Sequence, residues 1–569
     1  MPSHAPTNSK SGDRRITGPA TAAVAKSQDS PTMQSRMTCP IQAHPARPRS
    51  DEPHEGSVGE TSGARWAVLI LIAATLVGRM LFGLCLGLGI DESYTVATGR
   101  HPQLSTFDHP PAAWWLAWGA GQLFATESAL VLRLPFILLF AATTWLTYRL
   151  TAYLFDERAG FWAAVALNFA PVIAWTSGTW ILPDGPLNAA LMAASYATAK
   201  AVFGSRRTAP LWWLAAGGCG GLAMLSKFHA IFLFAGVALF LLTCRAHRRW
   251  LLSPWPYLAV VVAALMFLPV VVWNEQHGWV SFAFQGGRAR LQSISLLGPL
   301  AALGGQALYL LPWLWLPLVA CFAQAVAAGP ADDRRWMMAC LAVGPIFGFT
   351  AIALLGGRVL PHWAAPGYLM LFPLLGAELA RRIKNRDRVA QGWLIGTAAS
   401  LATVLALVIL MSQYPWPTMV GPGGKVVPYP LLETLDWKDL KTEIEARGLA
   451  NKPNLIVAAT RWHDAGKIDY ALGGLLPVLC LCEDPRGYGV LTRPRAHLGD
   501  TALIIGRNLL PERVAATYGA YFENIEQMRP IAIVHAGEPA FELSVYMGRG
   551  LREPNETPSL LDPLLLGRR

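Results

Sequence analysis

The chain has 569 residues, of which 53% are hydrophobic and only 15% are charged. A soluble globular chain carries about 25% charged residues, so the composition excludes an ordinary soluble protein and indicates a membrane protein. The formal net charge is +11, but the basic residues gather in short loops between apolar stretches. This pattern indicates membrane topology by the positive-inside rule, not a nucleic-acid partner. The basic loops are 205–208, 244–250, 332–336 and 381–388.

The N-terminal part of the chain predicts a tail followed by a membrane anchor. Residues 1–63 are rich in Ser, Pro, Thr, Gly and charge and lack apolar periodicity, which predicts a disordered cytoplasmic tail. The first apolar stretch, 66–88, is expected to act as an uncleaved signal anchor.

Ten further apolar stretches follow, each close to the ~20 residues that a membrane span needs. Together with the first they predict about eleven transmembrane helices within residues 64–412. An N-terminus in the cytoplasm places the basic loops there too, and the segment after residue 413 in the periplasm, with the spans in the inner membrane. The stretches are 129–150, 160–181, 186–203, 210–225, 229–244, 254–273, 294–325, 337–355, 363–380 and 391–412.

Residues 413–569 change character and predict a small soluble domain. Helical patterns at 465–474 and 511–521 alternate with short β-branched, apolar stretches. We therefore expect a polytopic α-helical membrane protein with a C-terminal periplasmic α/β domain. The expected strands are 454–460, 476–481, 502–506, 531–537 and 540–548.

The polar residues of interest lie in five loops that the predicted topology places on the outer side, beneath this domain. The loops are 89–115, 176–188, 225–232, 273–292 and 356–368. Their candidate residues are Asp91, Glu92, Asp108 and His109 in the first loop, Asp184 in the second, Lys227 in the third, and Arg358 and His362 in the fifth.

This set of side chains suits chemistry on a lipid-phosphate donor. A carboxylate can take the proton from an attacking hydroxyl, and Lys, Arg and His can neutralise a phosphate leaving group. Asp91 and Glu92 point about 100° apart on a helix, so we expect different roles for them. Each residue also has a structural alternative: a helix cap for Asp91, Glu92 and Asp184, a turn for Asp108–His109, and an interfacial side chain for Lys227.

Six motifs in this order resemble the polyprenyl-phosphate-sugar-dependent integral membrane glycosyltransferases of the GT-C fold. That group is glycosyltransferase family 39, with protein O-mannosyltransferases and lipid A aminoarabinose transferases among its relatives. The motifs are "DESY", "FDHPP", "LPDGPL", "SKFHAI", "NEQHGWVSFAFQ" and "RVLPHW", and the resemblance covers roughly residues 65–410.

The resemblance implies a role for several residues. Asp91 would be the catalytic base and the first acid of an Asp-Glu pair with Glu92. Asp184 would shape the donor or acceptor pocket, and Lys227 and Arg358 would hold the donor phosphate.

Our leading hypothesis is an inverting glycosyltransferase that moves one sugar from a polyprenyl-phosphate carrier to a lipid, glycan or protein acceptor at the outer face of the inner membrane. The site as interpreted needs no cofactor, and a divalent metal is not indicated. The alternatives are a membrane transporter or lipid flippase, which would place ionisable groups at mid-membrane, and a non-catalytic scaffold whose outer domain binds a partner.

Overall fold

The computed structural model describes residues 58–288, 293–414, 431–554 and 559–561. These described residues belong to one compact unit. The first helix, α1, begins at Val58, inside the segment 1–63 that the sequence predicts to be disordered. The rest of that predicted tail lies outside the described residues.

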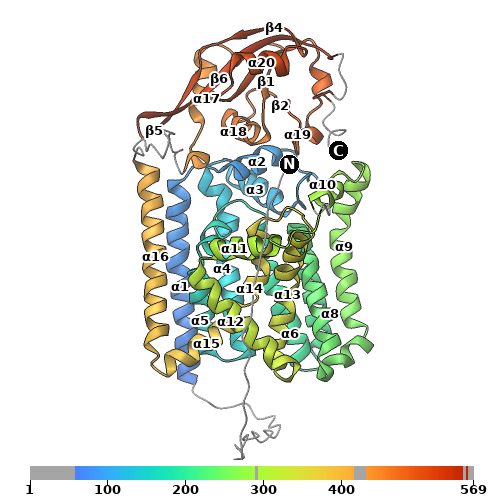
Figure 1. Ribbon diagram of the computed structural model, residues 1–569, viewed down its shortest axis with the longest axis vertical. Coiled ribbons are helices and arrows are strands. Elements are labelled where there is room, and N and C mark those ends of the chain that lie inside the picture. Colours follow the sequence, from blue (N-terminus) through green and yellow to red (C-terminus); the bar gives the residue numbers. More distant parts are fainter. Residues whose placement is uncertain (1–57, 289–292, 415–430, 555–558, 562–569) are drawn as a thin grey trace, which may run out of the picture. The chain divides into compact units, whose positions relative to one another are not determined.

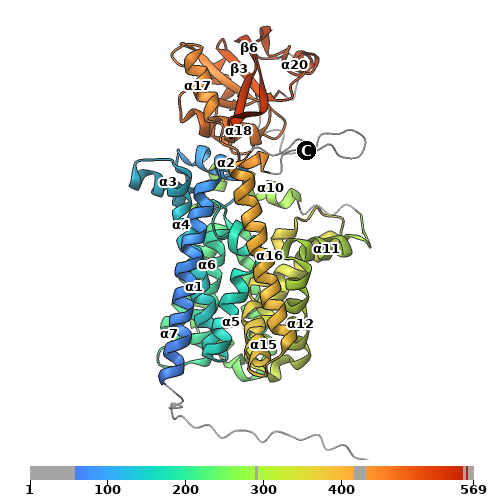
Figure 2. The ribbon, with the colours of Figure 1, turned by 90° about the vertical axis from the view of Figure 1, so that its left-hand side faces the viewer.

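The chain up to Gln413 is helical, and its long helices run side by side beneath the C-terminal strands (Figures 1 and 2). The α-helices are α1 (Val58–Cys85), α2 (Ile90–Gly99), α3 (Ala112–Phe124), α4 (Ala129–Leu154), α5 (Glu157–Asn168), α6 (Asp184–Phe203), α7 (Ala209–Ser226), α8 (Ile231–Thr243), α9 (Trp255–Gln276), α10 (Val280–Arg288), α11 (Gly298–Leu310), α12 (Pro312–Ala328), α13 (Asp333–Leu354), α14 (Ala365–Leu369), α15 (Phe372–Lys384) and α16 (Arg388–Gln413). Short 3-10 and π-helices connect them: η1 (Pro171–Thr176), η2 (Phe228–Ala230), η3 (Arg245–Leu252), η4 (Gly329–Ala331) and η5 (Pro361–Ala364).

The helical part is that of a multi-pass membrane protein. Within the described ranges, six helices are long and apolar enough to cross a membrane, or seven if the bent pair Phe228–Thr243 and Arg245–Leu252 is one span. Every expected stretch contains a helix, but 160–181, 294–325 and 363–380 are each interrupted. The predicted total of about eleven spans therefore stays a prediction.

The interruptions have local causes. Between α11 and α12, Leu311 has a φ of 71° and precedes Pro312, which has no N–H to continue the α11 ladder. In the stretch 160–181, α5 ends at Asn168 and the π-helix η1 follows. Arg79 of α1 donates from Nε to the carbonyl of Ala174 at 2.9 Å and from Nη2 to Asn168 Oδ1 at 2.8 Å. These bonds satisfy polar groups that the irregular segment would otherwise bury alone.

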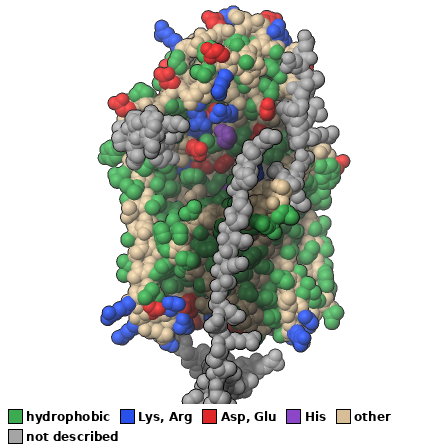
Figure 3. Space-filling view, viewed as in Figure 1, with side chains coloured by type: hydrophobic (Ala, Val, Ile, Leu, Met, Phe, Trp, Pro, Cys, Tyr) green, Lys and Arg blue, Asp and Glu red, His purple; other side chains and the backbone are tan. Residues whose placement is uncertain are grey.

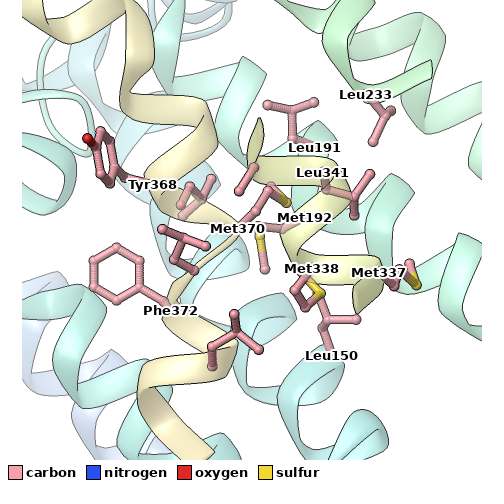
Figure 4. Packing of buried hydrophobic residues seen from close by; sticks show 14 of the residues in the cluster. Leu150, Leu191, Met192, Leu233, Met337, Met338, Leu341, Tyr368, Met370 and Phe372 are labelled. Carbon is pink, nitrogen blue, oxygen red and sulfur yellow. The ribbon is translucent and has the colours of Figure 1, made fainter. Parts of the chain in front are cut away.

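A closely packed apolar core holds α6, α13 and the segment around α14 and α15 together. Met192, Met338, Leu341 and Met370 are all almost fully buried, and Figure 4 shows their side chains meeting from different helices. Methionine side chains adapt to irregular gaps, which suits a region where α14 is short and α15 starts anew.

The C-terminal domain has a mixed sheet with strand order β2-β1-β3-β6-β4, and β5 pairs with β6. β1 is parallel to β2 and β3, whereas β6 is antiparallel to β3, β4 and β5. All five predicted strands are confirmed; β4 is additional, and its polar, largely exposed sequence "FENIEQ" hides it from an apolar pattern search. The elements are α17 (Lys438–Ala446), β1 (Leu455–Ala459), α18 (Trp462–Leu472), β2 (Val478–Cys480), α19 (Tyr488–Leu491), β3 (Thr501–Arg507), α20 (Pro511–Tyr518), β4 (Phe522–Gln527), β5 (Ile531–His535) and β6 (Glu538–Leu551).

A buried ion pair joins α2 to the helices beneath it. Arg133 on α4 and Glu92 on α2 are almost wholly inaccessible, and Arg133 Nη2 lies 2.6 Å from Glu92 Oε2. Arg133 also donates to carbonyls at the end of α1 and just after it, at Gly83, Leu86 and Gly87. Glu92 in turn accepts from the backbone amides of Gly89 and Ile181. One charge pair therefore fixes the turn from α1 into α2.

The C-terminal domain docks on the other face of α2 through α18. A Cβ added to Gly466 would lie 2.8–2.9 Å from backbone and Cβ atoms of Tyr94, so only glycine allows this approach. The next residue, Lys467, donates from Nζ to the carbonyls of Leu88 and Leu435, each at 2.6 Å. Burial lowers the pKa of Lys467 to about 8. Helix α2 is thus held between the helical part and the domain.

Replacing Gly466 by Ala should weaken this docking. The added methyl group meets backbone that cannot turn aside, and such overpacking costs about 1–3 kcal/mol. Thermal unfolding of the detergent-solubilised chain should show a lower Tm, and amide exchange should quicken around Tyr94. Gly392→Ala, on α16 with nothing within 4 Å of the added Cβ, is the matched control and should not lower Tm. Equal behaviour of the two variants would contradict the close contact.

Replacing Glu92 by Gln should leave the buried Arg133 charge uncompensated. Loss of one partner of a buried pair costs about 3–5 kcal/mol. Glu127→Gln removes a carboxylate from the more exposed pair with Arg100, where the expected cost is below about 1 kcal/mol. Thermal unfolding of both variants measures the contrast. Similar small shifts would show that Arg133 finds other partners.

Candidate active site

The five predicted outer loops meet in the structure. Trp273 Nε1 donates to Gln103 Oε1 at 2.6 Å, and Gln285 Nε2 donates to the carbonyl of Asp108, so the fourth loop is joined to the first. Lys227 of the third loop pairs with Asp184 of the second. Ring contacts join the third loop to the fourth and fifth, with the Phe228 and Phe282 rings 5.5 Å apart and those of His229 and Trp363 6.0 Å apart. His362 of the fifth loop also acts on the charge of Asp184.

Asp91 lies in the first turn of α2 and keeps an exposed side chain, whereas its neighbour Glu92 is buried. The different directions of these two side chains agree with the expected angle between adjacent helical positions. Part of the side chain is accessible, but the neighbouring protein desolvates the carboxyl group and so raises its pKa. The charges of Asp108, Glu433 and Glu92 add to the rise, while Arg486 opposes it. Asp91 is therefore an accessible carboxylate with more affinity for a proton than an ordinary aspartate.

Asp108 is buried and holds the first loop to the C-terminal domain. Its carboxylate accepts from Tyr94 at 2.5 Å and from Arg486 Nη1 at 2.8 Å. The Tyr94 hydroxyl in turn accepts from the amide of Gly487. The Arg486 guanidinium also lies 4.2 Å from the centre of the Trp462 ring, a favourable cation–π position. Asp108 therefore links the first loop to the C-terminal domain and is also a candidate site residue.

Charged side chains gather on the surface where α2 meets the domain. Figure 3 shows acidic, basic and histidine side chains together below the C-terminal strands. His463, on α18, stacks on Trp462 with ring centres 3.8 Å apart, and Arg486 and Glu433 both act on its charge. The C-terminal domain therefore supplies polar groups to the neighbourhood of Asp91.

Asp184 and Lys227 form a second, buried centre. Lys227 Nζ lies 3.0 and 2.9 Å from the two carboxylate oxygens of Asp184. Both residues lie at helix ends, because Asp184 begins α6 and Lys227 directly follows α7 as its C-cap. His362 and His229 are close enough to act on the Asp184 charge, and neither ring nitrogen of His229 has a hydrogen-bond partner among the described residues.

The remaining candidates are His109, His362 and Arg358. His109 is half-buried beside Trp114, with ring centres 6.4 Å apart, and His362 lies 6.2 Å from the Tyr309 ring. Arg358 is exposed and makes no hydrogen bond or ion pair with any residue that the structure describes. The structure thus brings Asp184, Lys227 and His362 together, and keeps Asp91 and Asp108 with the C-terminal domain.

Sequence reasoning missed Arg133 and Arg486. An arginine inside an apolar stretch is costly unless paired, so Arg133 within 129–150 carried a usable signal. Arg486 lies in the irregular segment after β2, and only the docking of the domain brings it to Asp108. Among the described residues, no group of three or more His, Cys, Asp or Glu is arranged to hold a metal ion.

Residues 108–273 match the family model described as dolichyl-phosphate-mannose-protein mannosyltransferase. No curated protein sequence matches the chain. The crystal structure of ArnT from Cupriavidus metallidurans in the apo state has a TM-score of 0.58 at 15% identity, over 85% of this chain and 98% of that chain.

The structure of the same ArnT bound to undecaprenyl phosphate has a TM-score of 0.56 at 14% identity, over 84% of this chain and 97% of that one. At this identity the likeness concerns the fold, and it includes helical part and C-terminal domain alike. The chain therefore has the GT-C fold of ArnT, and its predicted resemblance to polyprenyl-phosphate-sugar-dependent membrane glycosyltransferases is confirmed.

Proposed function

We propose that the chain transfers a single sugar from a polyprenyl-phosphate-linked donor to a lipid, glycan or protein acceptor, with inversion at the anomeric carbon. This proposal rests on a contrast within the acid pair. Glu92 is buried in an ion pair with Arg133, whereas the Asp91 carboxylate is accessible and has a raised pKa. The family match over residues 108–273 and the fold of ArnT support the same reaction class.

Asp91 acts as the general base. Its carboxylate takes the proton of the acceptor hydroxyl as the hydroxyl oxygen bonds to the anomeric carbon. The bond between that carbon and the donor phosphate oxygen breaks in the same displacement, and the polyprenyl phosphate leaves with the electron pair. Attack opposite to the leaving group inverts the configuration. The raised pKa suits this role, because it increases the driving force for proton transfer.

The donor phosphate is stabilised by cations from two loops. Arg358 is exposed and has no carboxylate partner within the described ranges. Lys227 uses two of its three N–H groups on Asp184, which leaves one for a phosphate oxygen. Asp184 orients Lys227, and the imidazoles of His362 and His109 offer further hydrogen-bond donors to the departing phosphate.

Glu92 and Asp108 act through other residues. Glu92 fixes the first turn of α2 through Arg133 and so directs Asp91, and Asp108 fixes the loop that leads to His109. Both are positioning residues in this scheme. The reaction requires no cofactor in our proposal, and the donor lipid and the acceptor are the partners. We place the reaction at the outer face of the inner membrane, as the basic loops predict.

The alternative functions are less well supported. The comparisons give no support to a transporter or lipid flippase. A non-catalytic scaffold would use the C-terminal domain as a docking module and would tolerate changes at Asp91. The Asp91 experiment separates this alternative from catalysis.

Changing Asp91 to Asn should remove the base and reduce sugar transfer by about 10²-fold or more, with little change in Tm because the side chain is accessible. Transfer is measured with membranes or purified chain and a radiolabelled polyprenyl-phosphate sugar. Asp332→Asn is the matched control, since Asp332 caps α13 and Asn is an equally good cap. Wild-type rates in the Asp91 variant would refute the assignment.

The pH profile of transfer should follow the titration of Asp91. The base works only when deprotonated, so the rate should fall as pH decreases through its raised pKa, at a higher pH than an ordinary aspartate would give. Removing the Glu433 carboxylate by Glu433→Gln takes away one cause of the rise, so the acidic limb should move to lower pH. A shift in the opposite direction, or none, would mean that another group controls the limb.

A further inference from the structure

A crevice opens between α12, α15 and α16, in the part of these helices nearest to the basic segment 381–388. Its volume is about 310 Å³, within the range of small-ligand pockets (~300–1,000 Å³). Its walls are mostly apolar and include Leu316, Ala320, Leu375 and Trp393. Trp393 Nε1 donates to the carbonyl of Trp313 at 2.8 Å and so ties α16 to α12 beside it. We call this space the α12–α16 crevice.

One end of the α12–α16 crevice is polar. Glu378 and Arg382 line it, and Arg382 Nε donates to Glu378 at 2.6 Å while Nη1 donates to Asp387 at 3.2 Å. Arg381 pairs with the same glutamate. A guanidinium has five N–H donors, so Arg382 keeps three for a ligand at the mouth of the crevice.

Uncompensated positive charge surrounds this end. Lys384, Arg386 and Arg388 are exposed, and no carboxylate within the described ranges pairs with them. Residues 378–388 contain five basic and two acidic side chains. Figure 3 shows basic side chains gathered at this lower end of the helices, away from the C-terminal domain. We define these residues, with Arg382, as the basic rim.

We propose that the α12–α16 crevice binds an anionic glycerophospholipid, with an acyl chain along the apolar walls and the phosphate at the basic rim. Charge complementarity identifies the occupant, because basic pockets between membrane helices favour acidic lipid headgroups over zwitterionic ones. The crevice lies at the end of the helices opposite the five loops (Figures 1 and 2), so its lipid is separate from the sugar donor. The proposal does not depend on sugar transfer.

The experiment measures lipid binding to the full-length chain in detergent by native mass spectrometry. The probes are dioleoyl phosphatidylglycerol and dioleoyl phosphatidylcholine, which differ only in the headgroup. Wild-type chain should bind the first lipid more tightly. Each exposed basic residue near a membrane surface is worth about fivefold in affinity, so Lys384→Gln with Arg388→Gln should weaken phosphatidylglycerol binding about 25-fold.

Two further variants distinguish lipid binding inside the crevice from lipid binding to surface charge. Ala320→Trp fills the crevice from an exposed position and should remove tight binding of phosphatidylglycerol while Tm stays unchanged in lipid-free detergent. Arg206→Gln with Arg207→Gln changes two exposed arginines outside the crevice and should leave the affinity unchanged.

Four results would overturn the proposal. Equal binding of the two lipids would show an apolar crevice without headgroup selection. Loss of phosphatidylglycerol in the Arg206/Arg207 control would show binding to diffuse positive charge. Displacement of phosphatidylglycerol by undecaprenyl phosphate at equal concentration would assign the crevice to a polyprenyl lipid, and a dimer that Ala320→Trp dissociates would assign it to a second copy of the chain.

Discussion

The arrangement of the candidate site depends on the buried pair between Glu92 and Arg133. Two charges out of water are stable only when every hydrogen-bonding group finds a partner, and here the partners are backbone groups at the end of α1, at the start of α2 and at Ile181. The pair therefore joins three separate pieces of chain. Asp91 is the residue next to it, so the direction of the accessible carboxylate is set by a side chain that does not face the substrate.

A second constraint acts from the opposite side of α2. The C-terminal domain approaches through Gly466, Lys467 and Arg486, each of which contacts the first loop or the turn before it. Helix α2 is short, and a ten-residue helix is marginal on its own. Its stability comes from being packed between two larger bodies, and this explains why a loop rich in polar residues can hold a defined geometry.

Much of this could be predicted from the sequence, and the missing parts share a physical cause. Apolar stretches of the length of a span and short alternating strands identified the helical part, five of the six strands that the structure describes, and the five loops that meet. The candidates Asp184 and Lys227 lie at helix ends, where sequence patterns are informative. The helix breaks at Leu311 and η1 were not predicted, because hydropathy does not report backbone conformation. Arg486 escaped because its contact with Asp108 spans 378 positions of the chain, a distance that no local pattern covers.

The Asp108–Arg486 contact also bears on how hybrids of such proteins can be built. A domain exchanged at the segment after α16 would carry Arg486 away from the loop that holds Asp108, and would leave that buried carboxylate without its cation. The exchangeable unit is therefore not the C-terminal domain by itself. It is the domain together with the first loop, including Tyr94, whose hydroxyl is shared by Asp108 and the Gly487 amide. Sequence variation in this family of folds would then be expected to change these two regions in concert.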